Sequence, residues 1–157
     1  AASDVYKRQT LNVLYDENLI DNCATQGSYL LQRLFDLQAK YPKFIKEVRG
    51  RGLMVGIEFQ DISKTLPIGV RQVVAVLDDK LKGSLCGFVG SLLLRDYDIL
   101  VAFTEYNRNV IRLEPPLIVT QAEIDTFVDA LDDLLSRGVT RIVTDYARKI
   151  VRKGKEK

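Results

Sequence analysis

The 157-residue sequence contains no histidine and only two cysteines. Without histidine there can be no Ser-His-Asp triad and no imidazole proton relay. Cys23 and Cys86 lie far apart in apolar surroundings and lack the paired spacing of a zinc site. We therefore expect both thiols to be reduced and buried, as in a cytoplasmic protein.

Long apolar runs and an excess of one charge are also missing. The longest stretch without a charged residue, Gly83 to Leu94, is shorter than the roughly 18 apolar residues of a membrane-spanning helix. The 23 basic and 21 acidic side chains leave a net charge of +2, which is too balanced for a dedicated nucleic-acid-binding protein. The sequence therefore predicts neither a membrane segment nor a nucleic-acid partner.

The remaining composition, 46% hydrophobic and 28% charged, is typical of a globular protein, and the length suits one compact unit with one core. Residues 1–9 show neither helical nor alternating periodicity. Ser3–Gln9 also resembles an adapter-derived stretch found at the ends of translated metagenomic reads. We interpret residues 1–9 as a non-native or disordered leader, and the chain as a fragment.

Five segments have the features of helices, with apolar residues at helical spacing and recognisable ends. The first runs from Asp16 to Tyr41–Pro42, the second from Pro67 to near Leu81, and the third covers Leu85–Leu94. The fourth begins at the capping box of Thr120 and Glu123 and ends at Gly138, and the fifth covers Val139–Arg152. The last helix is basic. Because it contains Asp145 and lacks an aromatic membrane anchor of Trp or Phe, we interpret its charged residues as a solvated face.

Three segments are predicted strands: Val48–Phe59, Ile99–Phe103 and Val110–Leu113. The first has two fairly apolar faces, as expected of a central strand. The last two are close enough to form a hairpin, which ends at Pro115–Pro116 because proline cannot donate a ladder hydrogen bond. This order of elements predicts an α+β fold, with a small, mainly antiparallel sheet of three to four strands and helices packed on one face.

The glycine-rich run from Gly50 to Gly56 superficially resembles a dinucleotide-binding fingerprint. A phosphate-binding loop of that kind follows a strand and opens a helix, whereas these glycines open a strand. The pattern therefore favours a structural turn.

Arg112 is the strongest candidate binding residue. It lies on a strand just before a double proline, and such a rigidly held guanidinium suits bidentate recognition of a carboxylate. An edge-strand arginine that pairs with Glu114 or with solvent explains the same pattern equally well. Arg49 and Arg51 are weaker candidates.

Two blocks, Val48–Phe59 and Asn109–Thr120, closely resemble the C-terminal small domain of the class III aminotransferases, which are pyridoxal-phosphate enzymes of fold type I. Order and spacing match over most of Leu11–Leu135. We therefore assign residues 10–137 to this domain and residues 138–157 to a basic helix and tail. The run from Ile99 to Leu117 looks most like the putrescine, ornithine and acetylornithine members.

The resemblance implies that Arg112 binds the carboxylate of the substrate, and that Arg49, Gly50, Gly52 and Gly56 are architectural. It also implies that pyridoxal 5'-phosphate is held by a lysine of a large domain, and no lysine here matches that lysine's motif. We therefore predict no catalytic, cofactor-binding or metal-binding residue in this chain, and no activity of the chain alone.

For the parent protein, the resemblance implies a homodimer that transfers an amino group from an amino acid or diamine to 2-oxoglutarate, and we expect it in the cytoplasm. The alternative is a stand-alone, non-catalytic α+β module that binds a small carboxylate or a partner protein. A module of that kind should be a clean monomer or dimer, whereas a severed small domain should expose apolar surface and aggregate.

Overall fold

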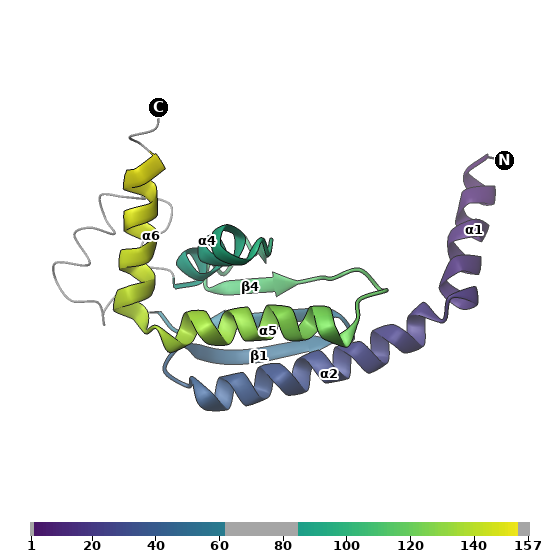
Figure 1. Ribbon diagram of the computed structural model, residues 1–157. Coiled ribbons are helices and arrows are strands. Elements are labelled where there is room, and N and C mark those ends of the chain that lie inside the picture. The colour runs from purple at the N-terminus through teal and green to yellow at the C-terminus, as the bar shows by residue number, and fades with distance from the viewer. Residues whose placement is uncertain (1, 62–84, 154–157) are drawn as a thin grey trace.

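The computed structural model describes residues 2–61 and 85–153, with side chains described for 5–61 and 85–148 (Figure 1). The helices are α1 (Ala2–Asp16), α2 (Leu19–Lys40), α4 (Leu85–Tyr97), α5 (Gln121–Ser136) and α6 (Val139–Lys153). The strands are β1 (Ile45–Arg51), β2 (Met54–Phe59), β3 (Ala102–Phe103) and β4 (Val110–Leu113). The helix predicted to begin at Pro67 lies outside the described residues.

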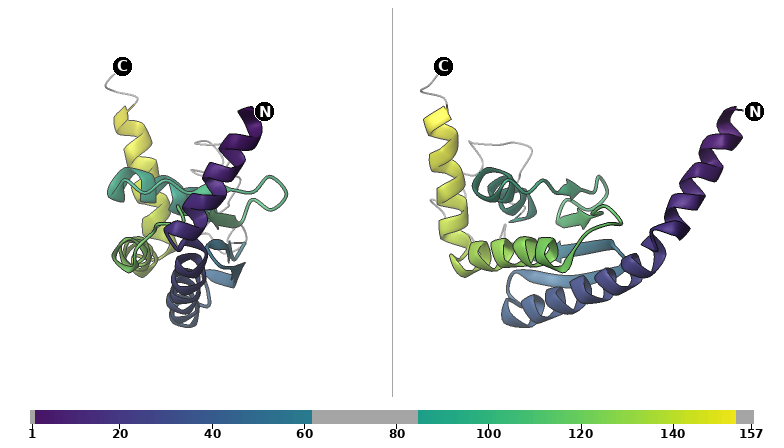
Figure 2. Two further views of the ribbon diagram at one scale, coloured as in Figure 1. Left: turned by 90° about the vertical axis from the view of Figure 1, so that its right-hand side faces the viewer. Right: turned by 45° about the vertical axis from the view of Figure 1, so that its right-hand side comes forward.

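The described strands form one sheet in the order β1-β2-β4-β3, and every neighbouring pair is antiparallel. This confirms the predicted α+β fold and the hairpin of the last two strands. Figure 2 shows α2, α4 and α5 together on one side of the sheet. Their apolar faces pack against the inward residues of the strands, and the core of this layer includes Leu34, Val55, Ile57, Phe88, Ile111 and Leu131.

The single strand predicted over Val48–Phe59 is wrong, because this segment is most of the hairpin formed by β1 and β2. Arg51 pairs with Met54, and Gly52 lies in the turn with a φ of 55°. Positive φ favours glycine. β1 escaped prediction because only Ile45 and Val48 among its seven residues are buried, and the register shifts between Ile45 and Glu47.

The leader predicted to lack regular structure is helical where it is described, since α1 begins at Ala2. Its sequence contains no glycine or proline, and intrinsic helix propensity needs no amphipathic pattern. Asn18, with a φ of 53°, separates α1 from α2, and α1 angles away from the body (Figure 1). The non-native origin of residues 1–9 stays a prediction.

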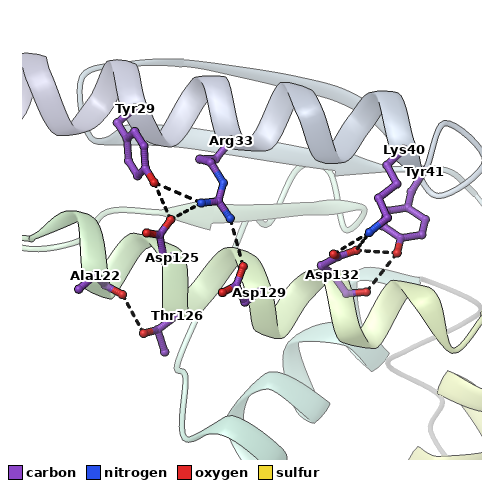
Figure 3. A network of polar contacts seen from close by, with 9 residues as sticks. All are labelled: Tyr29, Arg33, Lys40, Tyr41, Ala122, Asp125, Thr126, Asp129 and Asp132. Atoms are coloured by element: carbon purple, nitrogen blue, oxygen red, sulfur yellow. Dashed lines mark hydrogen bonds and ion pairs between the residues drawn. The ribbon is translucent and has the colours of Figure 1, made fainter.

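Charged side chains hold α2 beside α5 (Figure 3). Arg33 forms ion pairs with Asp125 and, at 3.1 Å, with Asp129. Nearer the end of α2, the Nζ atom of Lys40 lies 2.7 Å from a carboxylate oxygen of Asp132. The residue numbers of the paired side chains increase together along both helices, so α2 and α5 run parallel.

The ends of α5 follow the sequence prediction. The hydroxyl of Thr120 accepts a hydrogen bond from the Glu123 amide at 3.3 Å, and the Glu123 carboxylate accepts from the Thr120 amide at 2.8 Å. These reciprocal bonds are the predicted capping box. After the helix, Gly138 has a φ of 78°, which confirms its predicted place as a left-handed stop.

Both cysteines are free. Cys86 is buried as expected, and burial raises the pKa of its thiol to about 12. Cys23 is only partly buried, at the border where α2 meets the β1–β2 turn. Among the helices described here, none is long and apolar enough to cross a membrane.

Candidate functional site

Arg112 lies on β4 between the buried residues Ile111 and Leu113. Because side chains alternate along a strand, Arg112 faces away from the helix-covered core. Its side chain is 50% exposed. We define the polar face of the sheet by the residues that share this side in the observed register, which include Glu47, Arg49, Gly56, Glu58, Ala102 and Arg112.

The cross-strand neighbours of Arg112 are both small. Gly56 on β2 and Ala102 on β3 each pair directly with it. Neighbouring strands are about 4.8 Å apart, so larger residues at these positions would crowd the guanidinium. A Cβ atom added at Gly56 would meet only ordinary contacts, the nearest being Val110 at 3.5 Å. The small residues Gly56 and Ala102 therefore leave space beside the Arg112 side chain, and we call these two residues the floor.

One carboxylate of the chain already contacts Arg112. The Nε atom of Arg112 lies 3.2 Å from Oε1 of Glu114, whose side chain is 43% exposed. Within the described parts of the chain, the two terminal nitrogens of Arg112 donate no hydrogen bond. The pairing with Glu114 that the sequence left open is present, and it leaves donors of the guanidinium available.

A cavity of about 500 Å³ lies beside the end of β4. Most of its lining is apolar and comes partly from the helices that cover the core, with Leu30 of α2 and Ile124 and Phe127 of α5. Its charged lining residues are Arg112, Glu114 and Glu123. An apolar hollow with a few polar groups suits a ligand that has a hydrocarbon part and a charged end.

Arg49 also lies on the polar face, but internal carboxylates engage it. One guanidinium nitrogen lies 2.8 Å from Glu47 and 2.8 Å from Glu58. Glu58 is also 2.6 Å from the Nζ atom of Lys46, and its side chain is only 10% exposed. Hydrogen bonds from Lys46 and Arg49 lower the pKa of Glu58 to about 2. This arrangement supports an architectural place for Arg49, while Arg51 is exposed at the hairpin end.

Glycines allow two close approaches, that of α2 to the hairpin turn and that of β1 to β2. A Cβ atom added at Gly27 of α2 would lie 2.3 Å from the carbonyl carbon of Gly52, and one at Gly50 would lie 2.5 Å from the carbonyl oxygen of Met54. Both distances are too short for real atoms. The hairpin glycines therefore serve packing, in agreement with the architectural role expected of Gly50 and Gly52.

The lysines with described side chains do not fit the attachment of an aldehyde cofactor. Lys7, Lys40, Lys43 and Lys46 are all exposed, and none of them lines the cavity beside Arg112. Lys40 and Lys46 are held in ion pairs. Over residues 2–61 and 85–153, no group of three acidic, cysteine or histidine side chains could hold a metal ion.

Sequence reasoning found Arg112 but missed two features around it. The contact of Lys46 with Glu58 joins two strands, and it cannot be anticipated before the hairpin is recognised. Glu123 was expected only as a capping residue, yet it also borders the cavity. The double proline after Glu114 was the only local signal that the end of β4 is rigidly shaped.

The family model described as "Aminotransferase class-III" matches residues 4–135. The chain belongs to the class III aminotransferases. The predicted resemblance to this family is confirmed, and the match begins inside the segment that was interpreted as a leader. It ends within α5, so that α6 of this aminotransferase chain lies beyond it.

Curated relatives of this class III aminotransferase include enzymes named for diamine and amino-acid substrates. Putrescine aminotransferase of Pectobacterium atrosepticum is 33% identical over 128 residues, which cover 82% of this chain and 23% of the relative. Ornithine aminotransferase 1 of Staphylococcus aureus strain MRSA252 is 36% identical over 124 residues, with 79% and 24% covered.

Solved structures of aminotransferases share this fold. The structure of a lysine aminotransferase from M. tuberculosis matches with a TM-score of 0.61 at 26% identity, covering 84% of this chain and 25% of that chain. This class III aminotransferase chain thus spans about a quarter of the length of the relatives it matches.

Proposed function

We propose that this chain supplies the substrate-carboxylate-binding part of a pyridoxal-phosphate-dependent transaminase. The observation that carries the proposal is the arrangement around Arg112. Its terminal nitrogens donate no hydrogen bond to a described residue, and the small residues Gly56 and Ala102 lie beside it. Membership of the class III aminotransferases supports the reaction class, which is transfer of an amino group to an oxo acid.

In this proposal, Arg112 binds and orients the carboxylate of the oxo acid, 2-oxoglutarate. Two parallel N–H donors can match the two carboxylate oxygens, which fixes the orientation of the acid as well as its position. The amino donor is an amino acid or a diamine, a choice supported by relatives named putrescine and ornithine aminotransferase.

The cofactor of the proposed parent is pyridoxal 5'-phosphate. Because the exposed, ion-paired lysines described above do not suit its attachment, we place its binding in a part of the parent outside this chain. The chain alone is then inactive. We further propose that the parent works as a cytoplasmic homodimer.

The test uses the full-length enzyme that contains this chain. Arg112→Ala should raise KM for 2-oxoglutarate and lower kcat/KM by about a hundredfold or more, because the carboxylate loses both charge-assisted hydrogen bonds. Arg112→Lys keeps the charge but not the paired donors, so it should recover only part of the loss. Steady-state kinetics with varied oxo acid measure both effects.

The matched control is Arg148→Ala, which removes an exposed arginine from α6. Its kinetics should equal those of the parent enzyme. Unchanged kinetics of a folded Arg112→Ala enzyme with 2-oxoglutarate would contradict the proposal.

A further inference from the structure

The backbone around Glu114 is stiff, and this fixes where its carboxylate can reach. Glu114 follows β4 directly and precedes Pro115–Pro116. A residue before proline is restricted to extended conformations, so Glu114 continues the strand direction. Two positions along an extended chain return to the same side. Glu114 therefore reaches back to Arg112, as the 3.2 Å contact shows.

A guanidinium offers two edges for a carboxylate. One edge combines Nε with a terminal nitrogen, and the other combines the two terminal nitrogens. The shortest contact with Glu114 is made at Nε. Glu114 therefore lies at the first edge, and neither terminal nitrogen donates a hydrogen bond to a described residue, so the second edge can receive an external ligand.

We propose that Glu114 is a positioning residue for Arg112. Its carboxylate holds the Nε side of the guanidinium, which keeps the edge formed by the two terminal nitrogens available to the incoming substrate carboxylate. Glu114 acts through Arg112 and does not itself contact substrate. This inference rests on the proposed function, since it assumes that Arg112 binds the oxo acid.

A competing role has the opposite consequence. If Glu114 only neutralised Arg112, its removal would strengthen binding of an anionic substrate. If it holds the side chain in place, its removal lets the exposed guanidinium sample other rotamers and weakens binding. The sign of the change in KM separates the two roles.

The experiment measures KM and kcat for 2-oxoglutarate in the full-length holoenzyme. We expect Glu114→Ala to raise KM roughly five- to tenfold while kcat stays within about twofold, because only orientation of the binding residue is lost. Glu114→Gln keeps the length of the side chain but removes the charge of the ion pair, so its KM should rise as in Glu114→Ala. In an Arg112→Ala background, Glu114→Ala should add no further change.

Several results would overturn the inference. These are an unchanged or lowered KM in Glu114→Ala, an unchanged or lowered KM in Glu114→Gln, or a full penalty in the Arg112→Ala background. If Glu114→Ala fails to fold, Glu114→Asp gives the decision instead. It withdraws the carboxylate by one methylene and should also raise KM, so an unchanged KM would overturn the inference.

The two proposals fail in different ways. Loss of activity toward 2-oxoglutarate in Arg112→Ala, together with unaltered Glu114 variants, removes only the positioning role. An unaffected Arg112→Ala enzyme removes the proposed function itself.

Discussion

Two arginines on the polar face differ in what surrounds them. Arg49 contacts Glu47 and Glu58, and its pKa is raised chiefly by the hydrogen bond to Glu58. Among the described side chains, Arg112 forms an ion pair with Glu114 alone, and its terminal nitrogens donate no hydrogen bond. The same residue type therefore stabilises the sheet at one position and offers donors at the other.

Glu58 should make stability depend on acid pH. Its pKa is about 2 in the folded chain against an ordinary value of 4.5, so folding favours the ionised form. The stabilisation is fully present above about pH 4.5 and is lost as pH falls toward 2. Urea unfolding of the unsubstituted chain between pH 2 and 7 should show this loss of stability. Glu58→Gln should make the free energy of unfolding depend less on pH in this range.

The control for this titration is Glu47→Gln, which changes an exposed carboxylate on the same arginine. It should leave the acid profile close to that of the parent chain. Parallel profiles for the parent and Glu58→Gln would show that Glu58 does not carry the pH dependence.

The candidate site was predictable to the extent that its signals are local. Arg112 stands out because alternation and the following prolines act within a few residues. The contact between Lys46 and Glu58 depends on strand pairing, and the floor of Gly56 and Ala102 depends on register across three strands. No short segment of sequence contains that information.

At the scale of elements, the closest approach is between α2 and the β1–β2 hairpin. Gly27→Ala places a Cβ atom 2.3 Å from the Gly52 carbonyl carbon, so the helix must shift away from the hairpin. Overpacking of this kind costs about 1–3 kcal/mol, which exceeds the gain of roughly 1 kcal/mol or less from alanine in a helix. Chemical denaturation should therefore show a net loss of stability.

Ser28→Ala is the neighbouring control on α2, because Ser28 is exposed and its hydroxyl donates only to the Ala24 carbonyl. Its stability should stay within about 0.5 kcal/mol of the parent chain. A Gly27→Ala chain as stable as the control would mean that the approach of helix and hairpin is not tight.

Elements were predicted well where one strong pattern governs them and poorly where tertiary contacts do. The capping box and the glycine stop define α5 within a few residues of chain, and the prolines define the end of β4. β1 is an edge strand with a mostly exposed, charged sequence, so its partner β2 provides the reason that it is a strand. α1 has propensity without an apolar face, which periodicity does not detect.

At the scale of the whole molecule, α6 completes the described core although it lies beyond the family match. Ile142, Val143 and Tyr146 are buried, and the Tyr146 ring meets Phe88 of α4 at 5.0 Å between centroids. Arg137 adds a hydrogen-bonded ion pair of 2.6 Å to Asp133 beside the start of α6. The basic helix therefore uses its apolar side for packing.

Removing the buried ring should destabilise the entire chain. Tyr146→Ala leaves a cavity between α4 and α6, and truncation of a buried aromatic residue costs about 3–5 kcal/mol. Thermal or urea unfolding measures the loss, with Arg148→Ala as an exposed control on the same helix. If both variants unfold like the parent chain, α6 is a detachable tail.

The order of the strands also bears on self-association. β1 forms one edge of the described sheet and carries Lys46, Glu47, Arg49 and Arg51, while the opposite edge, β3, has only two residues. Charged or very short edge strands resist the addition of a further strand. Copies of this chain should therefore not polymerise through their sheets. Any aggregation should start from the exposed apolar side chains of α1, such as Leu11 and Tyr15.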